Sequence, residues 1–327
     1  MNEKLVDTYG RTLDYLRIGV TDRCNLRCRY CMPEEGIDFS KREDLLSYEE
    51  MVRLATIFSE LGVTKVRLTG GEPFVRKDIS KLLGSLRPLF SSFHITTNAS
   101  LLHHHFDELA DLNISSLNIS LDSLDRNAFL MITRRDNFLE VEANILECVR
   151  LGIPVKINMV VMKGVNDHEM ADFIRYGMKH KIEVRFIEAM PFNEDDGNKT
   201  VYYDAQVMAS TLRNHFSSVD QLPGLKGSSS LTYLVDGHYR CGIIPSYSRS
   251  LCGTCNRIRL TPKGELLTCL YAQQGVDLMA AVRDNSMGND DLKKIIRATI
   301  LKKKMDGHAE EAERSDEVFR SMTTIGG

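Results

Sequence analysis

From Leu13 to Glu188, short β-rich runs alternate with longer stretches whose apolar positions recur at helical spacing. The short runs predict strands at Tyr15–Val20, Lys65–Thr69, Phe93–Thr97, Ser116–Leu121, Val155–Met162 and Glu183–Glu188. The longer stretches predict helices at Ser47–Leu61, Asp78–Leu89, His103–Leu112, Asn137–Leu151 and His168–His180. Ser47 and Glu50 have capping-box spacing, which supports the start of the first helix. Strands and helices in this order indicate parallel strands joined by helical crossovers.

Six such strands are fewer than the eight of a closed barrel. The pattern therefore predicts an α/β fold built on a partial, open (βα)₆ TIM-like barrel. A doubly wound sheet of six strands is the alternative, and periodicity does not separate the two. The alternation weakens after Pro191, so we expect a barrel core over residues 1–190 and a C-terminal region over residues 191–327.

Every unusual motif of the first region follows a predicted strand. In a barrel of this kind, functional residues lie at the C-terminal ends of the strands or in the loops after them. The motifs, in strand order, are the cysteine loop that begins at Cys24, Gly70-Gly71-Glu72-Pro73, Asn98, Asp122-Ser123 and Ala189-Met190-Pro191. Their common position predicts one functional site on this rim.

The bulk composition excludes several classes of protein. The chain has 327 residues, of which 43% are hydrophobic and 27% charged, as is ordinary for a globular protein. A net charge of −3 provides no general field for nucleic acid or an anionic membrane. No apolar run reaches the length of a membrane span, and the start Met1-Asn2-Glu3-Lys4 opens no signal peptide. We therefore expect a cytoplasmic protein that binds neither nucleic acid nor membrane.

Cys24, Cys28 and Cys31 form a first cysteine group directly after the first predicted strand. A [4Fe–4S] cube normally takes four cysteines. Three would leave one iron open to a ligand or substrate. A structural zinc loop is the alternative, but zinc usually takes four ligands, often as two pairs of cysteines. The spacing favours a cluster over zinc.

Cys252, Cys255 and Cys269 form a second group of three, which again indicates a cube with an open iron. A zinc site completed by Cys241 or a histidine is the alternative. Arg257 and Arg259 follow the second cysteine of this group, and alternation along a strand would point both toward one face. Two convergent guanidinium groups suit a polyphosphate or a carboxylate.

The first cysteine group, with aromatic Tyr30 before its last cysteine and Gly70-Gly71-Glu72-Pro73 after the second strand, resembles the radical S-adenosylmethionine (SAM) enzymes. Within them, the chain resembles the GTP 3′,8-cyclase family (molybdenum cofactor biosynthesis protein A) nearly end to end. The resemblance rests on Asp7-Thr8-Tyr9-Gly10-Arg11, Arg17 in its strand, both cysteine groups and the terminal Gly326-Gly327.

The resemblance implies two [4Fe–4S] clusters as metal centres. Cys24, Cys28 and Cys31 would hold the cluster that cleaves S-adenosylmethionine, and Cys252, Cys255 and Cys269 an auxiliary cluster that faces the guanine. Residues expected to contact S-adenosylmethionine are Tyr30, Gly71, Glu72, Ser120 and Met190. Residues expected to bind GTP are Arg17, Arg67, Thr96, Lys156, Arg257, Ile258 and Arg259. Residues expected to serve the reaction itself are the first three cysteines, Arg17, Arg257, Arg259, Gly326 and Gly327.

The implied activity is that of a lyase in the first step of molybdenum cofactor biosynthesis. A 5′-deoxyadenosyl radical would remove the C3′ hydrogen of GTP, and the product would be 3′,8-cyclo-7,8-dihydro-GTP. Expected partners are GTP, an electron donor that the sequence does not identify, the next enzyme of the pathway and, as an assembly, a second copy of the chain. Two alternatives stay open: a peptide-modifying maturase of the same superfamily, and a non-catalytic zinc-binding interaction protein.

Overall fold

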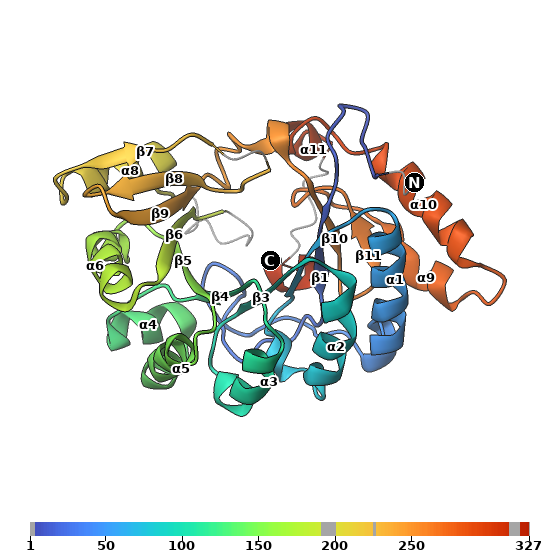
Figure 1. Ribbon diagram of the computed structural model, residues 1–327, viewed down its shortest axis with the longest axis horizontal. Coiled ribbons are helices and arrows are strands. Elements are labelled where there is room, and N and C mark those ends of the chain that lie inside the picture. The colour runs from blue at the N-terminus through green and yellow to red at the C-terminus, as the bar shows by residue number, and fades with distance from the viewer. Residues whose placement is uncertain (1–3, 191–200, 225–226, 314–320, 327) are drawn as a thin grey trace.

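The computed structural model describes residues 4–190, 201–224, 227–313 and 321–326. Within these residues one curved sheet of twelve strands has the order β12-β11-β10-β1-β2-β3-β4-β5-β6-β9-β8-β7 (Figure 1). The barrel strands are β1 (Tyr15–Gly19), β2 (Lys65–Thr69), β3 (Ser92–Thr97), β4 (Ser116–Ser120), β5 (Val155–Val161) and β6 (Glu183–Glu188). The other strands are β7 (Val219–Gln221), β8 (Leu231–Val235), β9 (Tyr239–Ile244), β10 (Arg257–Leu260), β11 (Glu265–Leu267) and β12 (Val276–Asp277).

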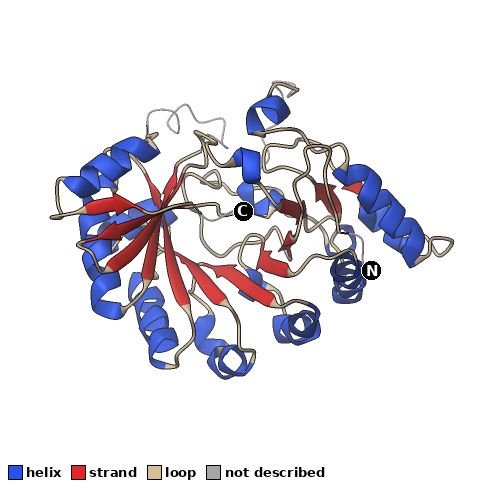
Figure 2. Ribbon diagram, turned by 45° about the horizontal axis from the view of Figure 1, so that its top comes forward, coloured by secondary structure: helices blue, strands red, loops and turns tan. Residues whose placement is uncertain are grey.

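Strands β1 to β6 are parallel and lie side by side in chain order, with helices on the outside of the curve (Figure 2). The helices of this half are α1 (Tyr48–Glu60), α2 (Ile79–Leu86), α3 (Phe106–Asp111), α4 (Arg126–Thr133), α5 (Phe138–Arg150) and α6 (Met170–His180). Later helices are α8 (Ala205–Arg213), α9 (Leu278–Arg283), α10 (Asn289–Ile300), α11 (Gly307–Glu311) and α12 (Met322–Ile325). The prediction of a partial, open TIM-like barrel is confirmed.

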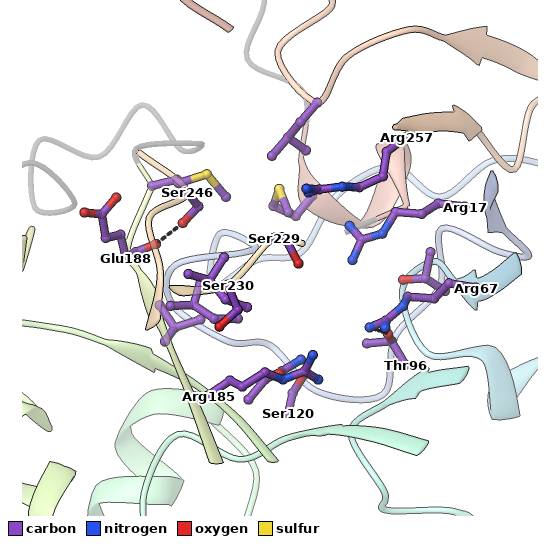
Figure 3. A pocket seen from close by; sticks show the side chains of 18 of the residues that line it. Arg17, Arg67, Thr96, Ser120, Arg185, Glu188, Ser229, Ser230, Ser246 and Arg257 are labelled. Carbon is purple, nitrogen blue, oxygen red and sulfur yellow. Dashed lines mark hydrogen bonds between the residues drawn. The ribbon is translucent and has the colours of Figure 1, made fainter. Parts of the chain in front are cut away.

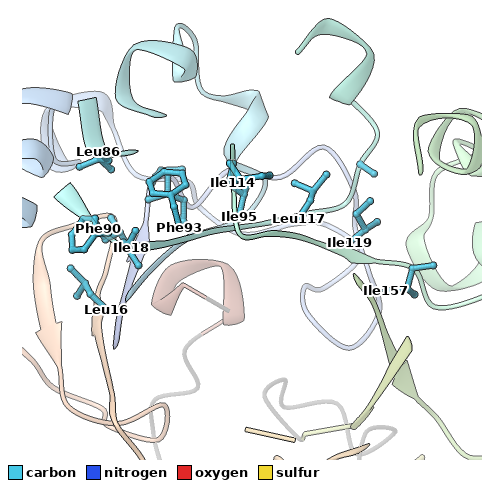
Figure 4. Close-up of a cluster of buried hydrophobic side chains, with 14 of the residues drawn as sticks. Leu16, Ile18, Leu86, Phe90, Phe93, Ile95, Ile114, Leu117, Ile119 and Ile157 are labelled. Carbon is cyan, nitrogen blue, oxygen red and sulfur yellow. The ribbon is translucent and has the colours of Figure 1, made fainter. Parts of the chain in front are cut away.

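The two faces of the barrel sheet differ in polarity. On the outer face, apolar strand residues such as Leu16, Phe93 and Ile119 pack against helix residues such as Leu86 in one buried core (Figure 4). Successive strand residues point to opposite faces, so the residues between them face inward. On β1 and β2 the inward residues include Tyr15, Arg17, Lys65 and Arg67. The concave face is therefore polar and charged, whereas burial of the outer face stabilises the fold.

The C-terminal region extends this sheet at both edges. Strand β10 pairs in parallel with β1, which sets Arg257 beside Tyr15 and Arg259 beside Arg17. At the other edge β9 pairs in parallel with β6. Chain after residue 190 thus completes the same sheet, and the boundary between residues 190 and 191 stays a prediction. No helix in the described ranges is both long and apolar enough to cross a membrane.

The six strand predictions agree with the structure to within one residue at every end, but α4 was not predicted. Asp125 caps this helix by accepting a hydrogen bond from the Ala128 amide at 2.8 Å. Leu130 and Met131 are exposed on it, which obscures its apolar stripe in the sequence. The predicted helices at Asp78–Leu89 and His103–Leu112 are shorter in the structure, because turns of 3₁₀ helix occupy Arg87–Leu89 and Leu102–His104.

Ser47→Ala is expected to lower the free energy of unfolding by about 1 kcal/mol, the usual contribution of a helix N-cap. The Ser47 hydroxyl accepts from the Glu50 amide at 3.2 Å, and the Glu50 carboxylate accepts from the Ser47 amide at 2.7 Å. Urea denaturation measures the change, with Ser47→Asp as the control because its carboxylate also caps. An equal loss in both variants would contradict the capping role.

Candidate active site

A cavity of about 1000 Å³ lies on the concave face of the barrel, lined by residues of the barrel strands and of the C-terminal region. Figure 3 shows Arg17, Arg67 and Arg257 pointing into it from one side and Arg185 from across it. Both cysteine groups line the same cavity. The curved sheet therefore brings together segments that are more than 200 residues apart in the chain.

Cys24, Cys28 and Cys31 lie in a tight loop after β1, where the amides of Cys31 and Met32 both donate to the Cys28 carbonyl, at 2.9 and 3.0 Å. Their thiols are half-buried and free of disulfides. Burial, the Asp122 carboxylate and the two neighbouring thiols raise the pKa of Cys28 well above its usual value. Three soft donors without disulfides, gathered at one cavity, fit a metal cluster, whose binding would displace the thiol protons.

Mononuclear metal sites have a different geometry. No three Cys, His, Asp or Glu side chains in the described ranges converge closely enough to hold one metal ion. The thiolates of a four-iron cube bind different irons, so this finding does not bear on a cluster.

Gly70, Gly71 and Glu72 brace the loop that carries the first cysteine group. The amides of Gly71 and Glu72 donate to the carbonyls of Thr21 and Arg23, both at 2.8 Å. A Cβ on Gly70 would overlap the Thr21 carbonyl oxygen, and one on Gly71 would overlap that of Arg23. Only glycine permits this approach of two backbones.

The Glu72 carboxylate is buried and joins the ends of β2 and β3. It accepts hydrogen bonds from the Thr97 hydroxyl at 2.8 Å and from the Asn98 amide at 2.6 Å. Burial raises the pKa of Glu72 to about 7, although these donors lower it. Asn98 in turn places its side-chain amide 3.8 Å from the Cys24 sulfur. Glu72 thus helps to hold the cysteine loop against the rim.

Two further contacts fix the cysteine loop from the far side of the cavity. The Tyr30 hydroxyl donates to the Asp122 carboxylate at 2.9 Å, and the Asp122 carboxylate also accepts from the Val160 amide at 2.8 Å. Burial raises the pKa of Asp122 to about 6. The loop is therefore tied to β4 and β5, across the opening of the barrel from its own strand.

Cations lie near the second cysteine group. Cys252 begins a 3₁₀ turn before β10, Cys255 follows that turn, and Cys269 follows β11. Burial works against ionisation of Cys255, but the charges of Lys303, Arg257 and Arg11 outweigh it and lower the pKa of this thiol. Carboxylates raise the pKa of Cys24 and Cys28 in the first group, whereas cations lower that of Cys255 in the second. Free thiols lining the cavity again fit a cluster.

Buried arginines on the concave face have donors without partners. The Nε atoms of Arg17, Arg67, Arg185 and Arg257 are buried and make no hydrogen bond, although that of Arg185 lies 3.9 Å from the Glu183 carboxylate. Burial and the charges of Arg17 and Arg257 lower the pKa of nearby Arg259 well below its usual value. Unsatisfied guanidinium groups are costly inside a protein. A multiply charged anion such as a polyphosphate would satisfy several of them at once.

Tyr15 is enclosed by these cations. The Lys65 ammonium lies 4.5 Å from the centre of its ring, and the Arg67 guanidinium lies 5.9 Å from it. Burial alone would raise the pKa of Tyr15, but Arg67, Arg17, Lys65 and Arg257 outweigh this effect and lower it to about 7. Without a ligand, the phenolate form of Tyr15 can partly balance the cationic surface.

Most residues singled out from the sequence line this cavity. All the residues expected to contact S-adenosylmethionine line the cavity: Tyr30, Gly71, Glu72, Ser120 and Met190. Of the residues expected to bind GTP, the following line the cavity: Arg17, Arg67, Thr96, Lys156, Arg257 and Arg259. Ile258 does not line it: its side chain alternates with the two arginines and is fully buried in the core. Only its backbone could meet a ligand, and the roles of all these residues stay predictions.

The C-terminal segment enters the cavity as well. Met322 and Thr323 line it, and the Ser321 hydroxyl donates to the Cys31 carbonyl at 2.9 Å. The Gly326 carbonyl accepts a hydrogen bond from the buried Arg259 guanidinium. Gly327 lies outside the described residues.

Sequence reasoning missed other residues of the cavity wall. Tyr15, Lys65, Asn158 and Arg185 line the cavity but were not predicted. Tyr15, Lys65 and Asn158 each stand two positions from a predicted residue on the same strand, namely from Arg17, Arg67 and Lys156. Because side chains two positions apart on a strand share a face, this alternation would have predicted all three residues at the cavity. Arg185 is a charged residue on an otherwise largely apolar strand, which is a weaker signal of the same kind.

Comparison with known families supports the interpretation of both halves. Residues 18–177 match the family described as Radical SAM superfamily, and residues 182–309 match Molybdenum Cofactor Synthesis C. A solved structure, SuiB of Streptococcus suis bound to S-adenosylmethionine, superposes with a TM-score of 0.62 over 95% of this chain and 77% of that one. At 16% identity this likeness shows the fold alone. Fold, rim loop and family match together define the class as the radical SAM proteins.

Closer relatives narrow the class. GTP 3′,8-cyclase of Desulforamulus reducens is 38% identical over 99% of this chain and 100% of that protein. The mitochondrial GTP 3′,8-cyclase of Arabidopsis thaliana is 40% identical over 100% of this chain and 84% of that protein. The chain belongs to the GTP 3′,8-cyclase family. It spans 56% of the length of a longer relative, molybdenum cofactor biosynthesis protein 1 of Drosophila melanogaster, at 39% identity.

Tyr15→Phe is expected to remove a proton linkage from anion binding. An anion that engages the surrounding cations would raise the pKa of Tyr15 from about 7, so that binding takes up a proton. Affinity for inorganic triphosphate should then fall as the pH rises through about 7, by up to about tenfold per pH unit. Calorimetry between about pH 6 and pH 8 measures this dependence.

Triphosphate also changes its own ionisation over this pH range, but this contribution is the same for wild type and Tyr15→Phe. It therefore cancels when the pH dependences of their affinities are compared. Tyr48→Phe, which alters a tyrosine that does not line the cavity, is the matched control. The same pH dependence in wild type and Tyr15→Phe would contradict the linkage.

Proposed function

We propose that the chain converts GTP to 3′,8-cyclo-7,8-dihydro-GTP, the first step of molybdenum cofactor biosynthesis. The observation that carries this proposal is the single cavity that joins two three-cysteine groups to a wall of arginines with unsatisfied donors. Family membership supports it independently. A cavity of about 1000 Å³ is at the upper end of the range for small-molecule sites, which suits a nucleotide together with a second ligand.

The cofactors would carry the radical chemistry. When bound, two [4Fe–4S] clusters and S-adenosylmethionine supply the electron and the 5′-deoxyadenosyl radical that removes the C3′ hydrogen. Cys24, Cys28 and Cys31 would hold the cluster that serves S-adenosylmethionine. Cys252, Cys255 and Cys269 would hold the auxiliary cluster.

The chain itself binds and orients the two substrates. Arg17, Arg67 and Arg257 converge from neighbouring strands, and they would hold the triphosphate with Arg185 facing them. Tyr30 belongs to the first cysteine loop, whereas Met190 packs near Cys269, and we propose that both contact S-adenosylmethionine together with Ser120, since all three line the cavity. Fixing both ligands within one cavity sets the ribose near the radical source and excludes water from it.

The two alternatives account less well for this surface. A peptide-modifying maturase has no evident need for several buried arginines whose donors await an anion. A zinc-binding interaction protein would leave the glycine brace and the cavity without a use. We further propose that the product passes to the next enzyme of the pathway, that the chain forms a homodimer and that it acts in the cytoplasm. The electron donor stays unassigned.

The decisive experiment measures 5′-deoxyadenosine formed anaerobically from S-adenosylmethionine and dithionite on cluster-reconstituted protein, with and without GTP. We expect strong stimulation by GTP together with its consumption. ATP, which offers the same triphosphate on another base, is the matched control. Cleavage that does not respond to GTP would reject the cyclase while keeping the radical mechanism.

Cys24→Ala is expected to abolish cleavage of S-adenosylmethionine and to remove about half of the bound iron, since one of two four-iron clusters is lost. Iron analysis and electron paramagnetic resonance (EPR) spectroscopy measure the remaining cluster. Cys148→Ser is the control, because Cys148 is buried in the core away from the cavity. Loss of all iron in Cys24→Ala would show that the two sites do not assemble independently.

A further inference from the structure

Lys303 is a buried lysine beside the second cysteine group. It follows the C-terminal end of α10, and only 4% of its surface is exposed, whereas its neighbour Lys302 is exposed. Its ammonium donates to the carbonyl of Arg257 at 3.3 Å and to that of Thr268. Arg257 is two residues after Cys255, and Thr268 directly precedes Cys269. The charge therefore lies between the two segments that carry these cysteines.

No carboxylate in the described ranges forms an ion pair with Lys303. Lys304, by contrast, pairs with Glu313 at the surface. Glu310 is near enough to Lys303 for its pKa to be affected, but burial is the larger effect and raises that pKa. Two carbonyl dipoles only partly replace the hydration of a buried ammonium, and a buried charge without a counter-charge is strongly destabilising. Thiolates of the second group would supply negative charge at this place if they bound a cluster.

At the first cysteine group the nearby cation is half-buried Arg27, whose guanidinium donates to the Cys24 carbonyl at 2.6 Å, but a carboxylate has the larger charge effect on this thiol. The largest charge effect on Cys28 comes from Asp122, and the largest on Cys24 comes from Glu72. Both carboxylates are buried at the rim. The largest charge effects thus differ in sign between Cys28 in the first group and Cys255 in the second.

Resting on the proposed function, we propose that Lys303 is the built-in counter-ion of the second cluster, and that its charge makes this cluster easier to reduce. Reduction adds one electron from an external one-electron donor and breaks no bond, so the cluster and its thiolates gain one negative charge. A fixed positive charge nearby stabilises the reduced form more than the oxidised form. Net charge and nearby hydrogen bonds are among the factors that set iron–sulfur potentials. Lys303 is a positioning residue, since it acts through the cluster and need not touch GTP.

The test is an EPR-monitored redox titration of the reconstituted full-length chain. Lys303→Met should disfavour reduction of the second cluster about tenfold or more, which corresponds to a midpoint potential lower by about 59 mV for one electron. The first cluster should be unaffected. Repeating the titration in a Cys24→Ala background leaves only the signal of the second cluster.

Three variants separate charge from structure. Lys302→Met, at the exposed neighbour, should leave both midpoints unchanged, and Lys303→Arg should retain the wild-type midpoint. Lys303→Gln removes the charge but keeps a hydrogen-bond donor for the two carbonyls. It therefore tests the effect of the charge even if Lys303→Met does not take up the second cluster. An unchanged midpoint in Lys303→Gln, or equal shifts of both clusters, would overturn the proposal. GTP-stimulated cleavage of S-adenosylmethionine is assayed separately. An unchanged midpoint in protein that still shows this cleavage would reject the role of Lys303 and leave the proposed function standing.

Discussion

Parallel, in-register pairing of β10, β1 and β2 sets Arg257, Tyr15 and Lys65 side by side on one face of the sheet. The next inward positions repeat the arrangement with Arg259, Arg17 and Arg67. Like charges at this spacing repel each other, and burial adds the cost of their lost hydration. The apolar core on the opposite face of the same strands stabilises the sheet that holds them together. The structure thus keeps a cationic wall ready for an anion.

The cysteine loop depends on the same sheet in a different way. Two parallel strands end at one rim, so the turn after β2 can reach the loop after β1, and Gly70 and Gly71 let their backbones meet. Glu72 and Asn98 extend this bracing to β3 and to the Cys24 sulfur. The family resemblance assigns the Gly70-Gly71-Glu72-Pro73 motif to S-adenosylmethionine binding. In this structure the motif also has a structural role, because it holds the first cysteine loop in place without a bound ligand.

The C-terminal region completes the site rather than covering it. Strand β10 contributes the arginines of one edge, and the loops around it contribute the second cysteine group. Lys303 and Arg11 approach that group from segments far apart in the sequence, since Arg11 donates to the Cys252 carbonyl at 3.2 Å. Buried Glu72 and Asp122 thus lie near the first cysteine group, and buried Lys303 lies near the second. Two chemically similar donor sets are made different by charges that the fold places around them.

The sequence by itself determined the barrel strands, the helix cap at Ser47 and both cysteine groups, because periodicity, capping and metal-ligand spacing are local patterns. It also indicated that Arg257 and Arg259 share a face, since alternation along one strand is local too. Only the tertiary structure decided that Arg185 faces Arg17 across a cavity and that Tyr15 is ringed by cations. It alone decided that Lys303 lies between Cys255 and Cys269. These relations join residues on different strands and helices, and the closing of the sheet, rather than any spacing along the chain, sets the distances between them.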